Sequence, residues 1–508
     1  MSEEYSAIMK RILVISTVLA FGLAASCRLL PERFAVNAPM FQQIFGTGGT
    51  PASASLLQQR IDLPQGFSIG VFAEGIRPRM LRFTTAGDLL VSAPRDGSIL
   101  WLAADTDGDG RSDGMRTLLS ELDRPNGIDV HDGWLYVAEG SAVGRIRFDA
   151  STGETRGSYR RLVEGLPSGG NHWTRTLRVG PDGFLYVSIG SSCNVCEEED
   201  PRRAAILRYQ LDGSGEEIFA SGLRNAVGFD WRPETGDLYA TDNGRDLLGD
   251  DFPPCELNRV VAGGFYGWPH SNGDRVPDPD FGEGHEREIR ESIPPEHDFR
   301  AHNAPLGIAF VREEAAPAAY RGAALVALHG SWNRTRKDGY KLVSLHWGES
   351  GEIEERDFAV GFEDDEKVIG RPVDVAVGPD GAFYVSDDYA HAIYRIVEGD
   401  LPSAPSVPPV PSAARVPRPP DSKPANASRE RAQARGLELY EGLACYGCHD
   451  VARADAGTIA IPLEERLRGR EVEEIADFLE APTPPMPAYD LDAVSRRDLA
   501  IYLLESTR

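Results

Sequence analysis

The stretches DGWLYV (residues 132–137) and DGFLYV (residues 182–187) repeat one pattern, an Asp-Gly pair followed by alternating apolar and small residues. The Asp-Gly pair is a strong hairpin signal, and the alternation is typical of a half-buried strand. Matching second strands are expected at 89–93, 134–139, 184–190, 237–243, 324–330 and 382–388. Six repeats of this length, each built from short strands, predict an all-β six-bladed β-propeller.

The repeats predict a propeller domain over residues 58–397, and the long interval 244–305 predicts an insertion on one face of the disc. Residues 401–428 are rich in Pro, Ser and Ala, which is typical of an extended linker. Residues 429–508 are expected to form a small all-α domain, because apolar residues recur there at helical spacing. The expected apolar faces contain Leu437, Tyr440 and Leu443, then Val472, Ile475, Ala476 and Leu479, and, on a last helix over 491–505, Leu499, Ile501, Tyr502 and Leu503.

The overall charge argues against nucleic acid as a partner. The 508 residues include 53 Lys and Arg against 79 Asp and Glu, giving a formal net charge of −26. Binding to phosphates needs clustered cations. We therefore expect no nucleic-acid binding.

The N-terminus has the features of an export signal. An apolar run over residues 12–25 follows Lys10 and Arg11 and ends in small residues before Cys27. We predict a signal peptide over residues 1–26 and a periplasmic protein. Cys27 stands where a bacterial lipoprotein is acylated and would anchor the protein to the membrane; the alternative is ordinary cleavage after Ser26 that leaves Cys27 unmodified.

The other cysteines divide by context. Cys193 and Cys196 form a C-x-x-C pair without a second pair to complete a zinc site. In an exported protein this pair predicts a local disulfide. Cys255 is expected to be buried.

The sequence CYGCH at residues 445–449 has the attachment pattern of c-type haem. Cys445 and Cys448 would bind the porphyrin, and His449 would be an axial iron ligand. Met486 lies in a Pro-rich stretch before the last helix and is the expected second ligand; the alternative role is that of a core methionine. His/Met ligation suits electron transfer. The segment resembles the small class I cytochromes c throughout its length.

The propeller segment resembles the quinoprotein sugar dehydrogenases, the six-bladed family of soluble glucose, aldose sugar and sorbosone dehydrogenases. The matching stretches lie at expected loop ends: NHWTR (171–175), GLRN (222–225), DNGRD (242–246), ELN (256–258), GFYGWP (264–269), GSWNR (330–334) and GRPVD (370–374). The family binds pyrroloquinoline quinone (PQQ) and Ca²⁺ at one mouth of the disc. Asn171 departs from glucose dehydrogenase, which has an acidic partner for the base there.

The resemblance implies a role for each matching residue. His172 would be the general base, and Arg224 would stabilise negative charge on the quinone oxygen. The expected cofactor contacts are Asn225, Arg334, Arg371 and Arg175, because PQQ carries three carboxylates. The expected calcium ligands are the backbone carbonyls of Gly244 and Arg245, and, at a second, structural site, Glu256, Tyr266 (backbone) and Asp274.

A separate calcium pattern lies at residues 105–113. Asp105, Asp107, Asp109 and Asp113 follow a D-x-D-x-D-G-x-x-D loop. Arg116 stands where a bidentate Glu would complete the site. The alternative is a solvated acidic turn.

The sequence is compatible with three functions. The leading hypothesis is PQQ- and calcium-dependent oxidation of an aldose, sugar aldehyde or related polyol, with electrons passing to haem c and then to a cytochrome or quinone-linked acceptor. The second possibility is a calcium-dependent lactonase-type hydrolase. Hydrolysis releases no electrons, so this function would not explain an attached haem. The third possibility is a propeller binding module that carries a cytochrome. Such a module would not need its charged residues at one mouth of the disc, so it could have His172, Arg224, Arg334 and Arg371 on different faces.

Overall fold

The computed structural model describes residues 37, 49–401, 432–433, 435–437, 439–440, 463, 467, 470, 472–480, 491 and 493–506. The chain divides into two compact units, Met1–Val407 and Pro408–Arg508. The boundary falls within the Pro-rich segment expected to be a linker. Among the described helices, none is long and apolar enough to cross a membrane.

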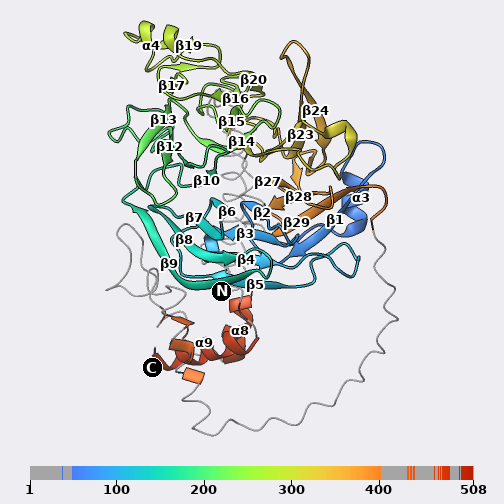
Figure 1. Ribbon diagram of the computed structural model, residues 1–508. Helices are drawn as coiled ribbons and strands as arrows, with labels where there is room; N and C mark the ends of the chain where they lie inside the picture. Colours follow the sequence, from blue (N-terminus) through green and yellow to red (C-terminus); the bar gives the residue numbers. More distant parts are fainter. Residues whose placement is uncertain are drawn as a thin grey trace, which may run out of the picture. The chain divides into compact units, whose positions relative to one another are not determined.

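The first unit contains six antiparallel sheets of four main strands each, following one another along the chain (Figure 1). Their strands, sheet by sheet, are β2 (Leu81–Phe83), β3 (Leu89–Ala93), β4 (Ser98–Leu102), β5 (Met115–Leu119); β6 (Ile128–His131), β7 (Trp134–Ala138), β8 (Ala142–Asp149), β9 (Glu154–Glu164); β10 (Arg175–Val179), β11 (Leu185–Ile189), β12 (Ala205–Tyr209), β13 (Glu217–Ser221); β14 (Ala226–Trp231), β15 (Leu238–Asp242), β16 (Cys255–Val260), β20 (His297–Phe299); β21 (Pro305–Phe310), β22 (Ala324–Leu328), β23 (Lys341–Trp347), β24 (Ile353–Ala359); β27 (Pro372–Val377), β28 (Phe383–Asp387), β29 (Ala392–Glu398) and β1 (Phe67–Glu74). The six expected second strands are β3, β7, β11, β15, β22 and β28, so the predicted repeat is confirmed.

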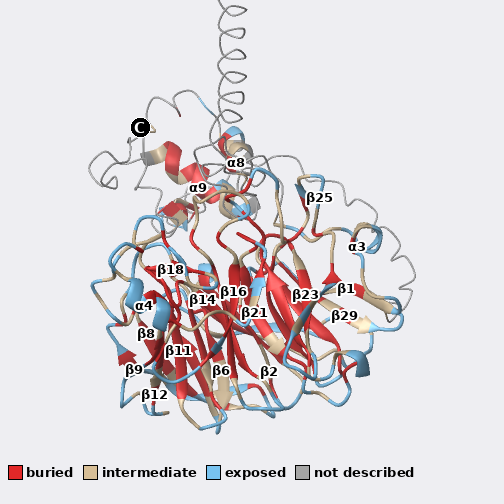
Figure 2. Ribbon diagram, turned by 90° about the horizontal axis from the view of Figure 1, so that it is seen from above, coloured by how far each residue is buried: buried red, intermediate tan, exposed pale blue. Residues whose placement is uncertain are grey.

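The ring closes through its N-terminal strand. Strand β1 pairs with β29 and so supplies the outer strand of the sixth sheet, which Figure 1 shows as blue beside orange. Six hydrophobic clusters lie between neighbouring sheets, including one between the sixth and the first. Most strands are buried along their length, while the outer loops are exposed (Figure 2). The fold is the six-bladed β-propeller that the repeats predicted.

Strand direction decides which loops share an end of the disc. In an antiparallel four-stranded sheet, the chain enters the first strand at the end where the second strand turns into the third. These two sets of connections therefore lie at one end of the propeller, which we call the mouth. The connections between first and second strands and between third and fourth strands lie at the other end.

The long fourth repeat carries the expected insertion. It runs from β16 to β20 and contains β17 (Gly264–Phe265), β18 (Ser271–Asn272), β19 (Val276–Pro277) and α4 (Glu286–Glu291). Strand β17 pairs with β13, so the insertion is attached to the outer edge of the third sheet. The remaining short elements are α3 (Ala54–Arg60), η2 (Pro94–Asp96), η3 (Ala318–Tyr320), β25 (Glu363–Asp364) and β26 (Lys367–Val368).

Charged side chains link the innermost strands. Arg82 on β2 pairs with Asp374 on β27 at 3.3 Å. Arg178 on β10 lies between Asp129 on β6, at 3.5 Å, and Asp230 on β14, at 3.3 Å. Buried charges are costly unless they are paired, so these pairs tie neighbouring blades together.

The second unit is helical in its described part. Its helices include α8 (Val472–Glu480) and α9 (Ala493–Ser506), and the second matches the expected last helix. Ile475, Leu479, Leu499 and Leu503 are buried in one apolar cluster. Tyr440 joins this cluster, but Leu437 is 42% exposed and does not share its face as expected. The helical prediction is confirmed for the described residues.

The haem prediction itself stays a prediction. Cys445, Cys448, His449 and Met486 lie outside the described residues, as does Cys27.

Candidate functional site

The residues expected to form a cofactor site come from loops at the mouth. His172 follows β9, Arg224 and Asn225 follow β13, Arg334 follows β22, and Arg371 precedes β27. A pure binding module could have these residues on remote faces of the propeller. In the structure they lie at one end instead. The arrangement favours a site built at one end of the disc.

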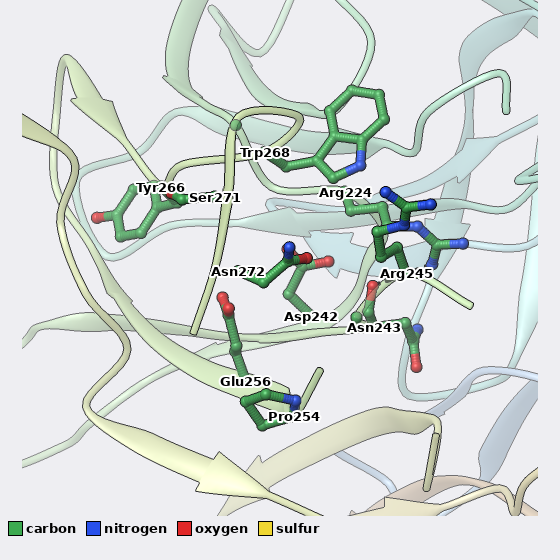
Figure 3. Close-up of a pocket in the computed structure, with 12 residues that line it drawn as sticks. Arg224, Asp242, Asn243, Arg245, Pro254, Glu256, Tyr266, Trp268, Ser271 and Asn272 are labelled. Atoms are coloured by element: carbon green, nitrogen blue, oxygen red, sulfur yellow. Dashed lines mark hydrogen bonds between the residues drawn. The ribbon is translucent and has the colours of Figure 1, made fainter. Parts of the chain in front are cut away.

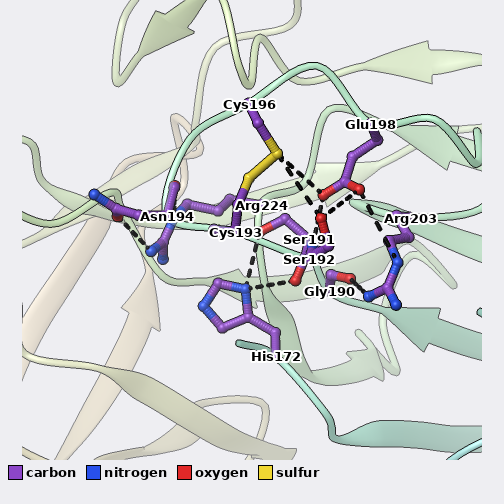
Figure 4. Close-up of a disulfide and its surroundings, with 10 residues drawn as sticks. All are labelled: His172, Gly190, Ser191, Ser192, Cys193, Asn194, Cys196, Glu198, Arg203 and Arg224. Carbon is purple, nitrogen blue, oxygen red and sulfur yellow. Dashed lines mark hydrogen bonds and ion pairs between the residues drawn. A yellow bond between two sulfur atoms is a disulfide. The ribbon is translucent and has the colours of Figure 1, made fainter. Parts of the chain in front are cut away.

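His172 is held through one ring nitrogen (Figure 4). Its Nδ1 lies 3.0 Å from the carbonyl oxygen of Ser191 and 2.9 Å from the Ser191 hydroxyl. That hydroxyl donates to the carbonyl of Cys193 at 2.8 Å, so it can accept from His172. A carbonyl oxygen only accepts, so this network assigns the proton to Nδ1. Nε2 has no hydrogen-bond partner among the described residues and is available as a proton acceptor.

The surroundings keep His172 neutral. Burial, together with the nearby positive charge of Arg224, lowers the pKa of His172 to about 3. A neutral imidazole is the form that can remove a proton from a hydroxyl group. The described geometry therefore allows His172 to accept a proton at neutral pH.

Arg224 is buried and held on all sides. Its Nε donates to the backbone carbonyl of Asn194 at 2.8 Å, and its Nη1 donates to the carbonyl of Asn243 at 3.0 Å. Its Nη2 contacts Asn194 Oδ1 at 2.9 Å and pairs with Asp246 at 3.1 Å. The guanidinium is thus a fixed positive charge close to His172.

Asn225 approaches His172 across a glycine. A β-carbon added to Gly190 would lie 2.6 Å from both the Asn225 Oδ1 and the His172 Cβ. Contacts this short are not tolerated, so a side chain at this position would separate the two residues. Gly190 therefore allows strand β11 to bring the His172 and Asn225 loops together.

Arg175 differs from the expectation of direct cofactor contact. It is fully buried, and its guanidinium donates to the carbonyls of His172 at 3.0 Å, Thr174 at 2.8 Å and Pro167 at 2.5 Å. The side chain therefore points into the protein. There it supplies the hydrogen-bond donors that the buried carbonyls of the loop before β10 need. Arg175 braces the loop that carries His172.

The other two cations lie further round the mouth. Arg334 donates to the carbonyl of Ala301 at 3.2 Å and pairs with Asp251 at 3.2 Å. Arg371 donates to the carbonyl of His329 at 3.2 Å. Among the described residues, no carboxylate lies within 4 Å of the Arg371 guanidinium. Arg371 therefore provides positive charge that no close ion pair neutralises.

A small pocket next to Arg224 contains two buried carboxylates (Figure 3). Asp242, at the end of β15, is the cross-strand partner of Glu256 on β16. Burial raises the pKa of Asp242 to about 7 and that of Glu256 to about 8, and the charge of Asp242 contributes to the second shift. Two carboxylates that are buried together in this way suit a hard divalent cation. Gly244 and Arg245, expected as backbone ligands, also line the pocket.

The lining of this pocket matches the expected structural calcium site only in part. Glu256 and Tyr266 line the pocket, and the Tyr266 hydroxyl points away to donate to the carbonyl of Arg259, so only its backbone is available. Asp274 has an 80% exposed side chain beside Arg275 and is absent from the lining. Asp242, which the sequence motifs did not assign to a calcium site, lines the pocket because the antiparallel register sets it opposite Glu256.

Calcium should stabilise the propeller through this pocket. We expect 1 mM Ca²⁺ to raise the thermal unfolding temperature by several degrees over an EDTA-treated sample, because a ligand at about 100 times its Kd contributes about 2.7 kcal/mol. The increase should grow as the pH rises from 5 to 8, since protons compete for carboxyls with raised pKa values. Scanning fluorimetry measures both. Asp242→Asn should remove most of the increase and Asp274→Asn should not; equal responses from the two variants would contradict this assignment.

The acidic loop at 105–113 joins third and fourth strands and so lies at the end opposite the mouth. The carboxylates of Asp105, Asp107 and Asp109 approach one another, but Asp105 already pairs with Arg395 at 3.0 Å. Asp113 accepts from the backbone of Thr106 at 3.0 Å instead of joining them. Calcium at this loop stays a prediction.

The cysteine predictions are confirmed. Cys193 and Cys196 form a disulfide in the loop between β11 and β12, and Cys255 is a buried free thiol.

Comparisons with known proteins found relatives in sequence and in structure. A protein of Borreliella burgdorferi described as uncharacterized is 30% identical over 70% of this chain and 95% of its own length. The pyrroloquinoline quinone-dependent pyranose dehydrogenase of Coprinopsis cinerea is 24% identical, and the match spans 58% of this chain and 46% of that protein. The calcium structure of Trichoderma reesei Carbohydrate-Active Enzymes Family AA12 superposes with a TM-score of 0.58 at 21% identity, covering 67% of this chain and 97% of that one.

The family model described as TrAA12-like matches residues 61–252 and 285–399. The gap between the two matched segments falls in the fourth-blade region that contains the insertion. The match covers more than half of the 508 residues and every blade, so the chain belongs to the TrAA12-like family.

Proposed function

We propose that this protein oxidises an aldose, sugar aldehyde or related polyol with PQQ and calcium as cofactors, and passes the electrons to a covalently bound c-type haem. The dehydrogenase part is supported by the TrAA12-like family match and by the likeness to a PQQ-dependent pyranose dehydrogenase. The haem part is supported by the CYGCH motif alone.

The residues at the mouth fit an anionic cofactor. Arg371 lacks a close carboxylate among the described residues, and the buried Nε of Arg334 and Oδ1 of Asn243 have no hydrogen-bond partner. Buried polar atoms are usually paired, so these groups could bind a ligand at the mouth. A tricarboxylate such as PQQ offers acceptors for the two arginines, and a calcium ion offers a partner for Asn243.

In the proposed mechanism, His172 binds the reacting hydroxyl of the sugar and removes its proton at Nε2. The guanidinium of Arg224 lies close to His172 and would favour negative charge on the quinone oxygen when PQQ is bound. PQQ supplies a two-electron acceptor for the hydride of the substrate carbon when it is bound. Arg334, Arg371 and Asn225 would hold that cofactor, while Asp242 and Glu256 would hold Ca²⁺ and keep the Arg224 loop in place.

The observation that carries the proposal is the pairing of a neutral histidine, with its Nε2 available, and a fixed arginine at the mouth. The test is to add PQQ, Ca²⁺ and a panel of aldoses, sugar aldehydes and polyols to the purified apoprotein. Reduction of an artificial dye is expected with at least one sugar, and none without PQQ. No dye reduction with any substrate would reject the dehydrogenase, and turnover of lactones instead would favour the hydrolase.

The same mixture tests the haem relay. Haem absorbance should shift to the reduced form when sugar is added to the complete system. A Cys445→Ala/Cys448→Ala variant should lose the haem bands but keep dye reduction within about twofold, since the propeller holds the reacting groups. A wild-type protein without haem after expression with cytochrome c maturation proteins would contradict this part.

We also propose export to the periplasm, with Cys27 as a lipid anchor. The apolar N-terminal run supports export, and the Cys193–Cys196 disulfide is consistent with an oxidising compartment. Cell fractionation tests export, and the mass of the mature N-terminus tests acylation of Cys27. A cytoplasmic full-length protein would contradict both.

A further inference from the structure

The loop that contains the disulfide lies against both catalytic candidates (Figure 4). It joins β11 to β12, begins at Gly190 and includes Ser191, Asn194 and the bonded pair Cys193 and Cys196. The disulfide closes a ring of four residues, and Asn194 lies inside that ring. This constraint restricts the conformations that are open to Asn194.

Asn194 contacts Arg224 twice and the loop after β15 twice. Its backbone carbonyl and its Oδ1 accept from Arg224 at 2.8 and 2.9 Å. Its Oδ1 also accepts from the backbone amide of Asp246 at 2.8 Å, and its Nδ2 donates to the Asp246 carbonyl at 3.0 Å. Since Asp246 is itself the ion-pair partner of Arg224, Asn194 fixes both members of the pair.

Ser191 connects the same ring to His172. Its hydroxyl and carbonyl both face Nδ1 of His172, and the hydroxyl donates to the carbonyl of Cys193. Its backbone amide donates to the carbonyl of Arg224 at 2.8 Å. A shift of the ring would therefore move the partners of His172 and of Arg224 together.

Residues on either side of the ring also contact one another and Cys196. Glu198 accepts from the amide and the hydroxyl of Ser192 at 2.5 and 2.8 Å, and Arg203 lies 4.0 Å from Glu198. These contacts lie within the loop that joins β11 to β12, and none of them reaches Arg224. Asn194 lies between the two bonded cysteines, so the disulfide restricts the orientation of the residue that contacts Arg224.

We propose that the Cys193–Cys196 ring is a positioning device for catalysis: Asn194 sets the orientation of Arg224, and Ser191 sets that of His172. The proposal rests on the proposed function, because it assigns these residues a part in the same reaction. None of them is expected to touch the substrate. Asn194, Ser191 and the disulfide act through Arg224 and His172.

The experiment compares Asn194→Ala, Asn194→Asp and the Cys193→Ser/Cys196→Ser pair with the wild type. Asn194→Ala should lower kcat by about 10- to 100-fold and change KM by less than about threefold, because small misplacements of reacting groups cost rates of this size. Asn194→Asp keeps the oxygen that accepts from Arg224, so it should retain more activity than Asn194→Ala. The serine pair should also lower kcat. Glu199→Gln, an exposed change in the same loop, should stay within about twofold.

Hydrogen–deuterium exchange of the apoprotein gives a readout that needs no cofactor. The amide of Asp246 should exchange faster in Asn194→Ala, because its acceptor is removed. The amide of Ser191 should exchange faster in the serine pair, and β22 should be unchanged in both. Wild-type kcat or wild-type exchange in Asn194→Ala would overturn the proposal, even if the serine pair failed to fold. A wild type that oxidises no sugar would reject the proposed function, while the exchange would still show whether the ring holds the Arg224 loop.

Discussion

Replacement of His172 by Asn should lower kcat for sugar oxidation by about two to four orders of magnitude, the usual contribution of a general base. Nε2 of this residue is the proton acceptor that the described site offers, and its orientation is fixed by Ser191 at the other ring nitrogen. An amide side chain can keep a hydrogen bond to Ser191 but cannot accept a proton at neutral pH. Steady-state kinetics with the best substrate of the panel measure the effect.

Binding and pH dependence separate a base from a structural histidine. PQQ affinity, measured by titration, should change little in His172→Asn, since the expected cofactor contacts lie elsewhere. His346→Asn, which changes a histidine in β23 of the fifth blade, should keep normal kinetics. Loss of PQQ binding together with activity in His172→Asn would contradict the role of base.

The low pKa of His172 also sets the direction of its pH dependence. A lowered pKa means that the neutral, active form persists as the pH falls below 6.5, the ordinary value for histidine. The acid limb of kcat/KM in the wild type should therefore lie below pH 6.5. An acid limb at or above that value would show that His172 is not in the described environment during catalysis.

Replacement of Asp230 by Ala should destabilise the propeller by about 3–5 kcal/mol, the usual cost of removing one partner from a buried ion pair. Asp230 is 1% exposed and pairs with Arg312 at 2.8 Å and with Arg178 at 3.3 Å. It also accepts from the backbone amide of Phe310 at 2.9 Å. Burial alone would raise the pKa of Asp230, yet the two arginines hold it below the ordinary value. The alanine variant would leave those cations and the amide without this partner.

Tryptophan fluorescence can isolate this effect. All seven tryptophans lie between residues 101 and 347, so unfolding followed by their emission reports on the propeller and not on the C-terminal domain. Glu291→Ala is the matched control, because it removes an exposed pair with Arg287 on α4 and should cost about 0.3–0.5 kcal/mol. Equal losses from the two variants would show that the central charges do not hold the blades together.

The fold could be read from local patterns because each blade repeats the same short-range signals. The glycine-containing turns and the alternating strands place the second strand of each sheet without knowledge of any distant contact. The insertion in the fourth blade was predictable for the same reason, since it interrupts a regular spacing. The closing strand was not predicted, because the pairing of β1 with β29 joins residues from opposite ends of the domain.

The candidate site also has a part that the sequence predicted and a part that it did not. Sequence motifs identified His172, Arg224, Glu256 and the disulfide, because the chemical type of a residue is written in the chain. Their partners are decided only by tertiary structure: Asp242 reaches Glu256 through strand register, Arg175 donates to the carbonyls of its own loop, and Asn194 meets Arg224 through a loop. A hydrogen bond or ion pair depends on atoms within a few ångströms of each other, and residues far apart along the chain are brought that close only when the ring of blades closes.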